Sequence, residues 1–598
     1  MAEPLDPVAE YGAHREGWRA RQALWQRSFV RIGNWRLTIA IGAGALAWLA
    51  FGPGLLSGWW LLLPLIVFVA LFVRHQGVIR RRTLAERAIR YYDRGLAKVQ
   101  DRWAAGGETG EQFRDNAHVY SEDLDVFGKG SLFELASTCR TAGGEDVLAS
   151  WLLETATRET ALARQEAVRE LRERLELREE IALLGEDVRS GVHAGMAARW
   201  GSQPPVRFPA PLRYLAPSLA ASGMAALLAY FAALIPLWPF LILLGCDFLF
   251  LFTIRKQTAV VIGGVEMPAK DLGILALMIA RLEREPFAAP LLKHLQSEFR
   301  VNGVAASGRI HHLQRWMEFL DSSDHVLIRV IGPVLLWREQ AAMGIEAWRQ
   351  TAGPHIGTWI CALGEFEALS SLASLAFDHP SWSFPDLAAD APPTFEAADL
   401  RHPLIPAAKC VANDASLNAD LRLLIVSGSN MSGKSTLLRT IGLNAVLAWA
   451  GAPVAAKHLR VSRLHIGASI RTTDSLQDNR SRFFAEITRI RQIVDLMRDD
   501  SAVLFLLDEL LSGTNSHDRR IGASGVIRGL LRGRTIGLIT THDLALAQLE
   551  QDLGALAANV HFEDHMEQGR MEFDYRLQPG VVTHSNALEL MRAVGLEI

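Results

Sequence analysis

The stretch that decides the fold is an apolar run followed by a glycine-rich loop. The run is Leu421-Arg422-Leu423-Leu424-Ile425-Val426, and the loop is Gly428-Ser429-Asn430-Met431-Ser432-Gly433-Lys434-Ser435-Thr436. The loop fits the pattern G-x-x-x-x-G-K-[ST], and residues 437–450 have the composition of a helix. In such a unit, backbone N–H groups surround phosphate oxygens at the N-terminus of the helix. We therefore expect residues 428–436 to bind a nucleotide, with Lys434 on its β- and γ-phosphates and Ser435 as a ligand of Mg²⁺.

Two more apolar runs end in residues that suit nucleotide hydrolysis. Residues 502–507 are followed by Asp508 and Glu509, and residues 535–539 are followed by Thr540-Thr541-His542-Asp543. Because the carboxyl ends of parallel strands share one edge of a sheet, these side chains should lie near the glycine-rich loop. We expect Asp508 to hold Mg²⁺, Glu509 to activate the attacking water and His542 to sense the γ-phosphate. Lys434, Glu509 and His542 are thus the predicted catalytic residues.

Three details of these motifs resemble the ATPase domain of MutS, the family of DNA mismatch-repair proteins. Asn430-Met431 is the family's loop variant, Arg480-Ser481-Arg482-Phe483-Phe484-Ala485-Glu486 is similar to its Arg-Ser-Thr-Phe-x-x-Glu segment, and Gly513-Thr514-Asn515-Ser516-His517-Asp518 is similar to Gly-Thr-Ser-Thr-x-Asp. The resemblance implies that the nucleotide is ATP with Mg²⁺, and that Ser481 reaches the γ-phosphate held by the partner subunit of a homodimer. The alternative is that Ser481 is a simple helix cap, with Glu486 on a solvated face.

The resemblance is firm over residues 395–598 and fainter over 118–180. Arg401-His402-Pro403-Leu404 matches the start of the family's ATPase domain, and His561 in Ala558-Asn559-Val560-His561 matches a histidine near the adenine. The family's mismatch-reading and connector domains have no counterpart here, and residues 257–375 are short for both lever helices and a DNA clamp. DNA binding is therefore implied by the resemblance alone, and the net charge of −3 adds no general basic surface.

Two long apolar runs predict membrane-spanning hairpins. Residues 37–73 contain no charge and are interrupted at Gly52-Pro53-Gly54, and residues 214–254 contain only Asp247 and are interrupted at 235–239. Each half has about the length that crosses a bilayer, and arginines flank the outer ends, so both hairpins should begin and end in the cytoplasm. A buried soluble core is the alternative. An acid inside such a run is a functional candidate, but we favour a structural role for Asp247.

The predicted fold is a C-terminal α/β ATPase domain, with a parallel sheet and flanking helices, preceded by an all-α region with two transmembrane hairpins. The predicted order is a basic cytoplasmic segment (1–36), hairpin 1 (37–73), a MutS-core-like helical region (74–210), hairpin 2 (211–254), a lever-like helical region (255–379), a linker (380–394) and the ATPase domain (395–598). The four cysteines are widely spaced and indicate neither a disulfide framework nor a zinc site.

Three functions fit this organisation. The first is a dimeric MutS-like ATPase, anchored in the cytoplasmic membrane and coupled to DNA binding or repair. The second is an ABC-type transporter, since Leu511-Ser512-Gly513-Thr514 is superficially like the transporter signature, although that signature precedes the Asp-Glu strand and this segment follows it. The third is a mechanochemical scaffold in which ATP closes the dimer and moves a membrane partner.

Overall fold

The chain divides into two compact units. The computed structural model describes residues 6–53, 55–189, 194–209, 211–388, 392–429, 431–471, 482–498, 501–511, 514–542, 544–567 and 570–582. The first unit comprises residues 1–136, 175–183 and 374–598, and the second comprises residues 137–174 and 184–373. The first unit thus combines the N-terminal helices with the C-terminal α/β domain, and the second is inserted between its parts.

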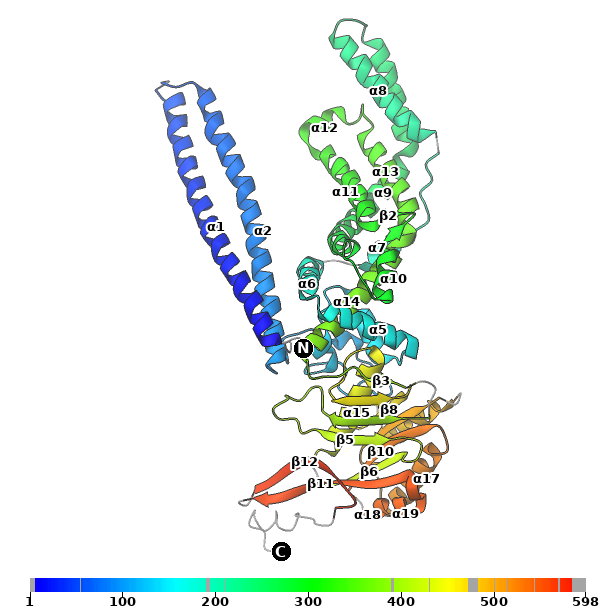
Figure 1. The fold of residues 1–598 in the computed structure, drawn as a ribbon. Coiled ribbons are helices and arrows are strands. Elements are labelled where there is room, and N and C mark those ends of the chain that lie inside the picture. Colours follow the sequence, from blue (N-terminus) through cyan, green and yellow to red (C-terminus); the bar gives the residue numbers. More distant parts are fainter. Residues whose placement is uncertain are drawn as a thin grey trace. The chain divides into compact units, whose positions relative to one another are not determined.

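The first unit opens with two long helices, α1 (Pro7–Phe51) and α2 (Leu62–Val99), joined through the 3-10 turn η1 (Gly58–Leu61) (Figure 1). The Asp6 side chain caps α1 by accepting the N–H groups of Val8 and Ala9, and α1 ends at its C-cap, Gly52. Both helices extend well beyond the apolar run at 37–73, because residues 8–36 and 74–99 contain no proline and are rich in Arg, Ala and Leu, which favour helix.

A small core anchors the lower end of this helix pair. Tyr11, Tyr92 and Leu96 are buried against Leu175 and Phe377. The Tyr11 hydroxyl donates a 2.6 Å hydrogen bond to the Asp378 carboxylate, and the Tyr92 hydroxyl donates to Glu179. Burial raises the pKa of both carboxyl groups above their usual range. The pair is therefore fixed at its base by apolar contacts and by buried hydrogen bonds.

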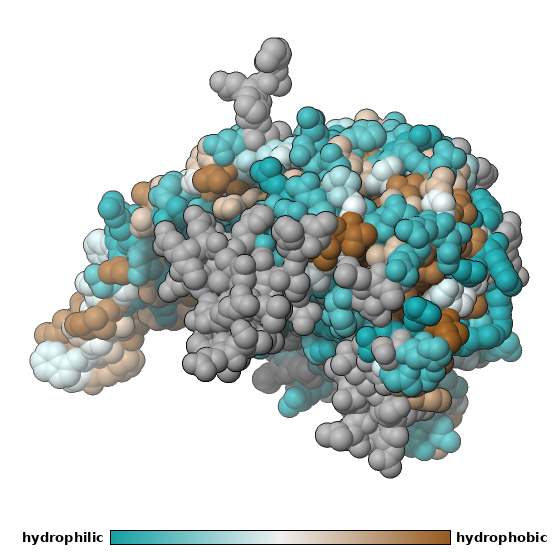
Figure 2. All heavy atoms as spheres, turned by 90° about the horizontal axis from the view of Figure 1, so that it is seen from below, coloured by the Kyte–Doolittle hydropathy of each residue, from teal (hydrophilic) through white to brown (hydrophobic). Residues whose placement is uncertain are grey.

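The distal part of the same pair exposes large apolar side chains. Trp48, Phe51 and Trp59 are 68%, 77% and 79% exposed. Such a surface is unusual for a chain surrounded by water. In Figure 2, hydrophobic side chains gather along this receding pair at the left, whereas hydrophilic ones predominate on the described surface of the α/β domain.

The α/β domain contains two sheets. The six-stranded sheet has the order β12-β11-β6-β10-β9-β8, and the four-stranded sheet has the order β3-β7-β4-β5. The strands of the first are β6 (Leu423–Ser427), β8 (His465–Ser469), β9 (Val503–Leu507), β10 (Thr535–Thr541), β11 (Ala557–Glu567) and β12 (Arg570–Pro579). Those of the second are β3 (Asp386–Leu387), β4 (Phe395–Leu400), β5 (Asn413–Leu417) and β7 (His458–Val461).

The predicted parallel sheet is correct for five strands and wrong for the edge. Strands β11, β6, β10, β9 and β8 are parallel, but β12 pairs antiparallel to β11, so the sheet is mixed. The physical reason is that β11 and β12 are too close in sequence for a crossover helix. The predicted linker at 380–394 contains β3, which pairs with β7 and so belongs to the second sheet.

Helices surround the six-stranded sheet. They are α15 (Lys434–Ala450), α16 (Arg482–Asp495), α17 (Ser516–Leu530), α18 (Leu544–Ala547) and α19 (Leu549–Leu553), with η6 (Gly554–Leu556). Every residue of β6, β9 and β10 is buried, which explains why these strands read as continuous apolar runs. Upstream, residues 100–131 form turns and η2 (Glu111–Phe113) before α3 (Leu132–Ala136).

The second unit is almost entirely helical. Its helices are α4 (Ala142–Leu153), α5 (Arg158–Arg172), the end of α6 (Leu175–Arg189), α7 (Ala194–Ser202), α8 (Leu212–Phe231), α9 (Trp238–Glu283), α10 (Pro290–Glu298), α11 (Ala306–Asp321), η3 (Ser322–Asp324), α12 (Val326–Ile331), α13 (Trp337–Ala352), η4 (Gly353–His355) and most of α14 (Ile356–Asp378). A two-stranded hairpin, β1 (Arg300–Val301) with β2 (Val304–Ala305), interrupts them.

Helices α8 and α9 form the second apolar hairpin, and Asp247 lies on α9. Phe231, Phe248 and Leu249 are 76%, 70% and 65% exposed, whereas Asp247 is only 1% exposed. A Cβ on Gly223 of α8 would lie 3.7 Å from an Asp247 carboxylate oxygen. The acid therefore faces the contact between the two helices, and its oxygens have no hydrogen-bond partner among the described residues.

Four described segments are long and apolar enough to cross a membrane. They are Gly58–Val99, Leu212–Phe231, Trp238–Glu283 and Trp337–Asp378. The first three coincide with predicted spans, but the predicted first span, at 37–51, is absent from this set. The fourth was not predicted, and 83% of its most apolar window is buried inside the protein, as expected of a core helix.

Candidate functional site

The sheet register brings the ends of three strands to one edge. Ser427 at the end of β6 pairs with Thr541 at the end of β10, and Leu507 at the end of β9 pairs with Ile539 two residues earlier. The residues that follow these strands therefore emerge next to one another, as the order of the motifs predicts. The glycine-rich loop, the Asp508–Glu509 pair and His542 meet at this edge.

The glycine-rich loop uses conformations that favour glycine. Gly428 and Gly433 have φ values of 150° and 105°, and Met431 has a φ of 71°. A Cβ on Gly428 would lie 2.8 Å from the Ser432 hydroxyl oxygen and 3.2 Å from the Phe562 carbonyl oxygen. A side chain at Gly428 would therefore displace the loop. Asn430 lies outside the described residues, and Met431 is 85% exposed.

Lys434 begins α15 and is turned into the loop. Its side chain is buried, and its Nζ donates hydrogen bonds of 2.8 Å and 2.7 Å to the carbonyl oxygens of Gly428 and Ser429. Burial lowers the pKa of Lys434, and the nearby Glu509 and Asp508 carboxylates oppose that shift. A buried cation beside acids at the N-terminus of a helix is suited to an anion with several oxygens.

The two acids after β9 are held by a threonine of β10. The Thr540 hydroxyl donates to an Asp508 carboxylate oxygen and accepts the Glu509 N–H at 2.9 Å. Glu509 has a φ of 46°, a strained value for a residue with a side chain. Its carboxylate lies 3.6 Å from His542 Nδ1. The side chains of Glu509 and His542 are partly exposed, so water can reach them.

A pocket of about 780 Å³ opens over these residues. Lys434, Ser435, Thr436 and Glu509 line it from the predicted motifs. His402, Lys409, Cys410, Asn413, Phe562 and Tyr575 are among its other lining residues. The pocket therefore joins a polar end, at the loop, to a wall with apolar and aromatic groups, a combination that suits a nucleotide.

The aromatic wall was missed by sequence reasoning. Tyr575 lies on β12, and its ring is 3.2 Å from the position of a Cβ on Gly433. Asn413 holds it there, because its amide donates to the Tyr575 carbonyl at 3.0 Å and accepts the Leu577 N–H at 2.7 Å. The matching histidine, His561, is not among the described lining residues; it contacts the Gly580 carbonyl and Glu563 instead.

The residues present fit a phosphate chain and Mg²⁺. The hydroxyl oxygens of Ser429 and Ser432 are buried without a hydrogen-bond partner among the described residues. Such groups carry a free-energy cost that a bound phosphate oxygen would remove. Ser435 and Asp508 offer a hydroxyl and a carboxylate, which are oxygen ligands of the kind that Mg²⁺ prefers, and Mg²⁺ keeps several waters besides.

Ser481 lies outside the described residues, but Glu486 does not. Glu486 is buried on α16, and its carboxylate accepts the Leu511 N–H just after the Asp508–Glu509 pair. The alternative that placed Glu486 on a solvated face is therefore wrong, because this acid satisfies a backbone group of the loop after β9. It ties α16 to the loop that contains Glu509.

An acidic segment far upstream also contacts this domain. Asp123 accepts the backbone N–H groups of Ile470 and Arg471, both at 2.7 Å. Asp125 pairs with Arg439 of α15 at 3.1 Å and with Arg471 at 2.8 Å. No motif marks these acids in the sequence, because their partners are more than 300 residues away. They support the far side of the helix that begins at Lys434.

The fold and the site define the class as an α/β domain with a glycine-rich loop at the carboxyl edge of its sheet. Residues 424–597 match the family model described as MutS domain V. This part of the chain is therefore similar to domain V of the MutS family, and the resemblance seen in the motifs is confirmed over these residues. The MutS family is a family of ATPases of DNA mismatch repair.

Proposed function

We propose that this protein is a membrane-anchored MutS-type ATPase that binds and hydrolyses ATP with Mg²⁺ between two copies of the chain. One observation carries the proposal. Lys434 and Glu509 line one pocket at the sheet edge, and Asp508 and His542 lie beside Glu509 at the ends of neighbouring strands. The buried Ser429 and Ser432 hydroxyls have no hydrogen-bond partner among the described residues, and they lie in the same loop as the buried Lys434, which favours a bound anion.

Each residue has a distinct task in this proposal. Residues 428–436 surround the phosphates, and Lys434 leaves the Gly428 and Ser429 carbonyls to contact the β- and γ-phosphates. Ser435 and Asp508 hold Mg²⁺, which neutralises phosphate charge when bound. Glu509 takes the proton of the attacking water, with His542 beside it at the γ-phosphate. Ser481 completes the site of the partner subunit.

Membrane anchoring through α1–α2 and α8–α9 is supported by their exposed apolar surfaces. Cysteine labelling tests the proposed topology in a background in which the four native cysteines are replaced. A cysteine at Ser57, in the turn between α1 and α2, should react with an impermeant reagent from outside the cell. A cysteine at Arg80 should react only after the membrane is opened. Equal labelling of both positions in intact cells would remove the hairpin proposal.

Coupling to DNA is the proposed use of ATP, by analogy with the family. The test is the ATPase rate of the detergent-purified protein alone and with duplex, mismatched or branched DNA. We expect basal hydrolysis and a rise of several-fold with at least one DNA structure. Hydrolysis that no DNA changes would disprove the coupling and leave the ATPase proposal intact.

A mechanochemical scaffold is the second candidate, and one observation favours it. The Tyr11–Asp378 hydrogen bond joins the base of α1 to the end of α14, directly before the strands of the α/β domain. Movement of that domain would therefore reach the membrane helices. If the protein is such a scaffold, the ATPase rate of the wild type should depend on lipid. Tyr11→Phe should then remove this lipid dependence without lowering basal hydrolysis. Unchanged lipid dependence would count against it.

A further inference from the structure

The part of the α1–α2 pair beyond its base has an extreme charge balance. Between Glu16 and Glu86 the chain contains nine arginines and no acidic residue. Several of these arginines already have partners within the pair. Arg36 lies over the Phe68 and Phe72 rings, and Arg81 lies over the Trp25 ring.

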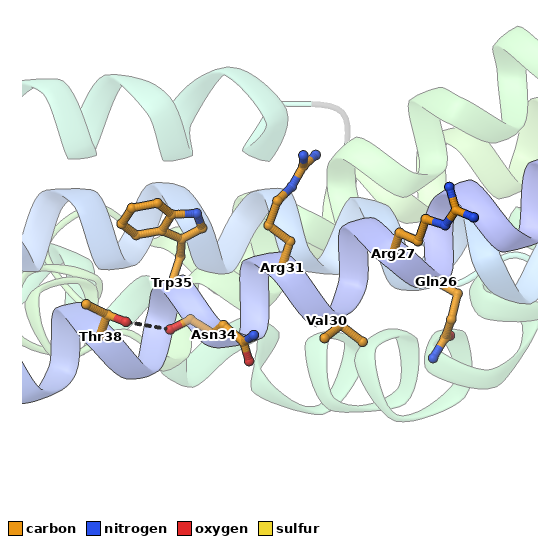
Figure 3. A pocket seen from close by; sticks show the side chains of 7 residues that line it. All are labelled: Gln26, Arg27, Val30, Arg31, Asn34, Trp35 and Thr38. Carbon is orange, nitrogen blue, oxygen red and sulfur yellow. Dashed lines mark hydrogen bonds between the residues drawn. The ribbon is translucent and has the colours of Figure 1, made fainter.

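Arg27 and Arg31 differ from those arginines. Both are exposed on α1, one helical turn apart, and neither takes part in a described ion pair or ring contact. They line an open groove of about 690 Å³ along one face of the helix, together with Gln26, Asn34 and Trp35. Figure 3 shows the Arg31 and Trp35 side chains projecting to the same side of α1. Two guanidinium groups, two amides and an indole thus lie along one face.

The distance of this face from the apolar run indicates which ligand it can bind. With 1.5 Å per residue, Trp35 lies about 3 Å, Arg31 about 9 Å and Arg27 about 15 Å before Leu37, where the apolar run begins. A headgroup layer is roughly 5–8 Å thick, and arginine side chains extend toward it. Trp35, which is 57% exposed, therefore reaches the boundary, and Arg31 and Arg27 reach phosphate level.

We propose that this face of α1 binds the headgroup of an anionic phospholipid, through Arg27 and Arg31 on the phosphate and Trp35 at the edge of the acyl chains. The proposal rests on the membrane insertion proposed above. An inorganic phosphate ion offers the same charge, but it leaves Trp35 and the apolar end of the groove without a partner. The absence of acids from residues 17–85 favours a surface of uniform negative charge over a protein with mixed charge.

The test measures lipid retention by the full-length protein in detergent, with native mass spectrometry. The probes are phosphatidylglycerol and phosphatidylcholine of equal chain length. The wild type should prefer phosphatidylglycerol, and Arg27→Gln/Arg31→Gln should lower its affinity roughly tenfold or more, because each arginine near a headgroup contributes about a factor of five. Arg19→Gln/Arg21→Gln is the matched control. It removes the same charge about 15–18 Å further from the apolar run than Arg31 and should change the preference less than twofold.

Further arms separate the explanations. Arg27→Lys/Arg31→Lys should keep the preference, whereas loss in both the Gln and the Lys variants would point to altered folding and overturn the proposal. Displacement of the lipid by millimolar inorganic phosphate would assign a free-anion site, and displacement by duplex DNA would assign a nucleic-acid surface; either overturns it. If the wild type retains both lipids equally, the headgroup proposal is overturned but membrane insertion is not. Retention of neither lipid by the wild type removes membrane insertion itself.

Discussion

Two regions break the usual rule that apolar groups are buried and polar groups are exposed. They are the edge of the six-stranded sheet and the distal ends of the helix pairs, and they break it in opposite directions. At the sheet edge, Lys434 and the Ser432 hydroxyl are buried polar groups; on the helix pairs, Trp59 and Phe248 are exposed apolar ones. Both arrangements cost free energy in water. Each fits a partner that we propose from matching chemistry, a phosphate chain in one region and lipid in the other. The segment Trp337–Asp378 is also apolar enough to cross a membrane, but it is mostly buried and needs no such partner.

The largest effect should come from breaking the polar region. Lys434→Ala removes the cation that meets the phosphates, so tight ATP binding should be lost. Glu509→Gln keeps the shape of the side chain but not the base, so binding should remain while hydrolysis falls by on the order of 10² or more. Nucleotide binding and single-turnover hydrolysis of the purified variants measure the two steps separately. Normal hydrolysis by Glu509→Gln would refute the assignment of the base.

A mixing experiment tests whether the polar region needs a second copy of the chain. Ser481→Ala and Lys434→Ala subunits should each be inactive alone. A heterodimer should regain one complete site, because the Ser481→Ala subunit keeps Lys434 and receives Ser481 from its partner. Activity should rise to as much as about half that of the wild type, since one site of two is intact. If heterodimers form and stay inactive, Ser481 acts within its own subunit or only caps a helix.

The apolar region can be broken with one charge and a matched control. Leu249 on α9 is 65% exposed, and Ile521 on α17 of the α/β domain is 59% exposed. If lipid covers Leu249, Leu249→Arg should cost roughly 2–3 kcal/mol of membrane insertion, whereas Ile521→Arg should stay within about 0.5 kcal/mol in stability. Insertion of the α8–α9 segment into microsomes measures the first, and thermal unfolding measures the second. Equal small effects would place both residues in water.

A smaller effect should arise from an acid inside the helical unit. Glu367 on α14 accepts the Arg140 N–H at 2.8 Å and the Thr141 N–H at 3.3 Å, and burial raises its pKa to about 7. Because the pKa is higher in the folded state than in the unfolded state, its contribution to stability is complete below about pH 4.5. That contribution, at most about 3 kcal/mol, is lost as the pH rises through 7.

The measurement is the unfolding temperature of the purified protein between pH 5.5 and 8. The wild type should lose about 5 °C more than Glu367→Gln, whose amide cannot ionise and can still accept one of the two N–H groups. A parallel decline in the two proteins would mean that Glu367 does not titrate in this range. Glu367 is thus a buried core group whose contribution to stability should depend on pH.

Local patterns predicted which strand ends meet at one edge, because the candidate residues occupy fixed places relative to strands. Lys434, Asp508 and His542 each follow an apolar run, and parallel pairing of those runs is enough to bring them to one edge. No such rule predicts which residues form the aromatic wall of the pocket. Tyr575 reaches the loop through the antiparallel β11–β12 pair and the Asn413 hydrogen bonds, which depend on tertiary contacts.

The helical regions were harder to predict, because apolar composition does not reveal what covers a helix. Residues 37–51 and Trp337–Asp378 both look apolar in sequence, yet Trp48 is exposed and Trp359 is buried. Only the contacts distinguish them, and these contacts join distant parts of the chain. For the same reason Asp123 and Asp125 could not be recognised, since their arginine partners lie on the C-terminal domain.

The contact between Asp123 and the Arg471 backbone has a consequence for synthesis, since 348 residues separate its two ends. At roughly 5–20 residues per second, the ribosome needs about 17–70 s to supply the second end after the first. The inserted unit, residues 137–174 and 184–373, is complete before then. Until then Asp123 and Asp125 lack their C-terminal partners, and in the topology proposed above α1 and α2 are already inserted in the membrane. A pause in synthesis, or a cleavage of the chain, between the two ends would leave the second unit complete and the first unit incomplete.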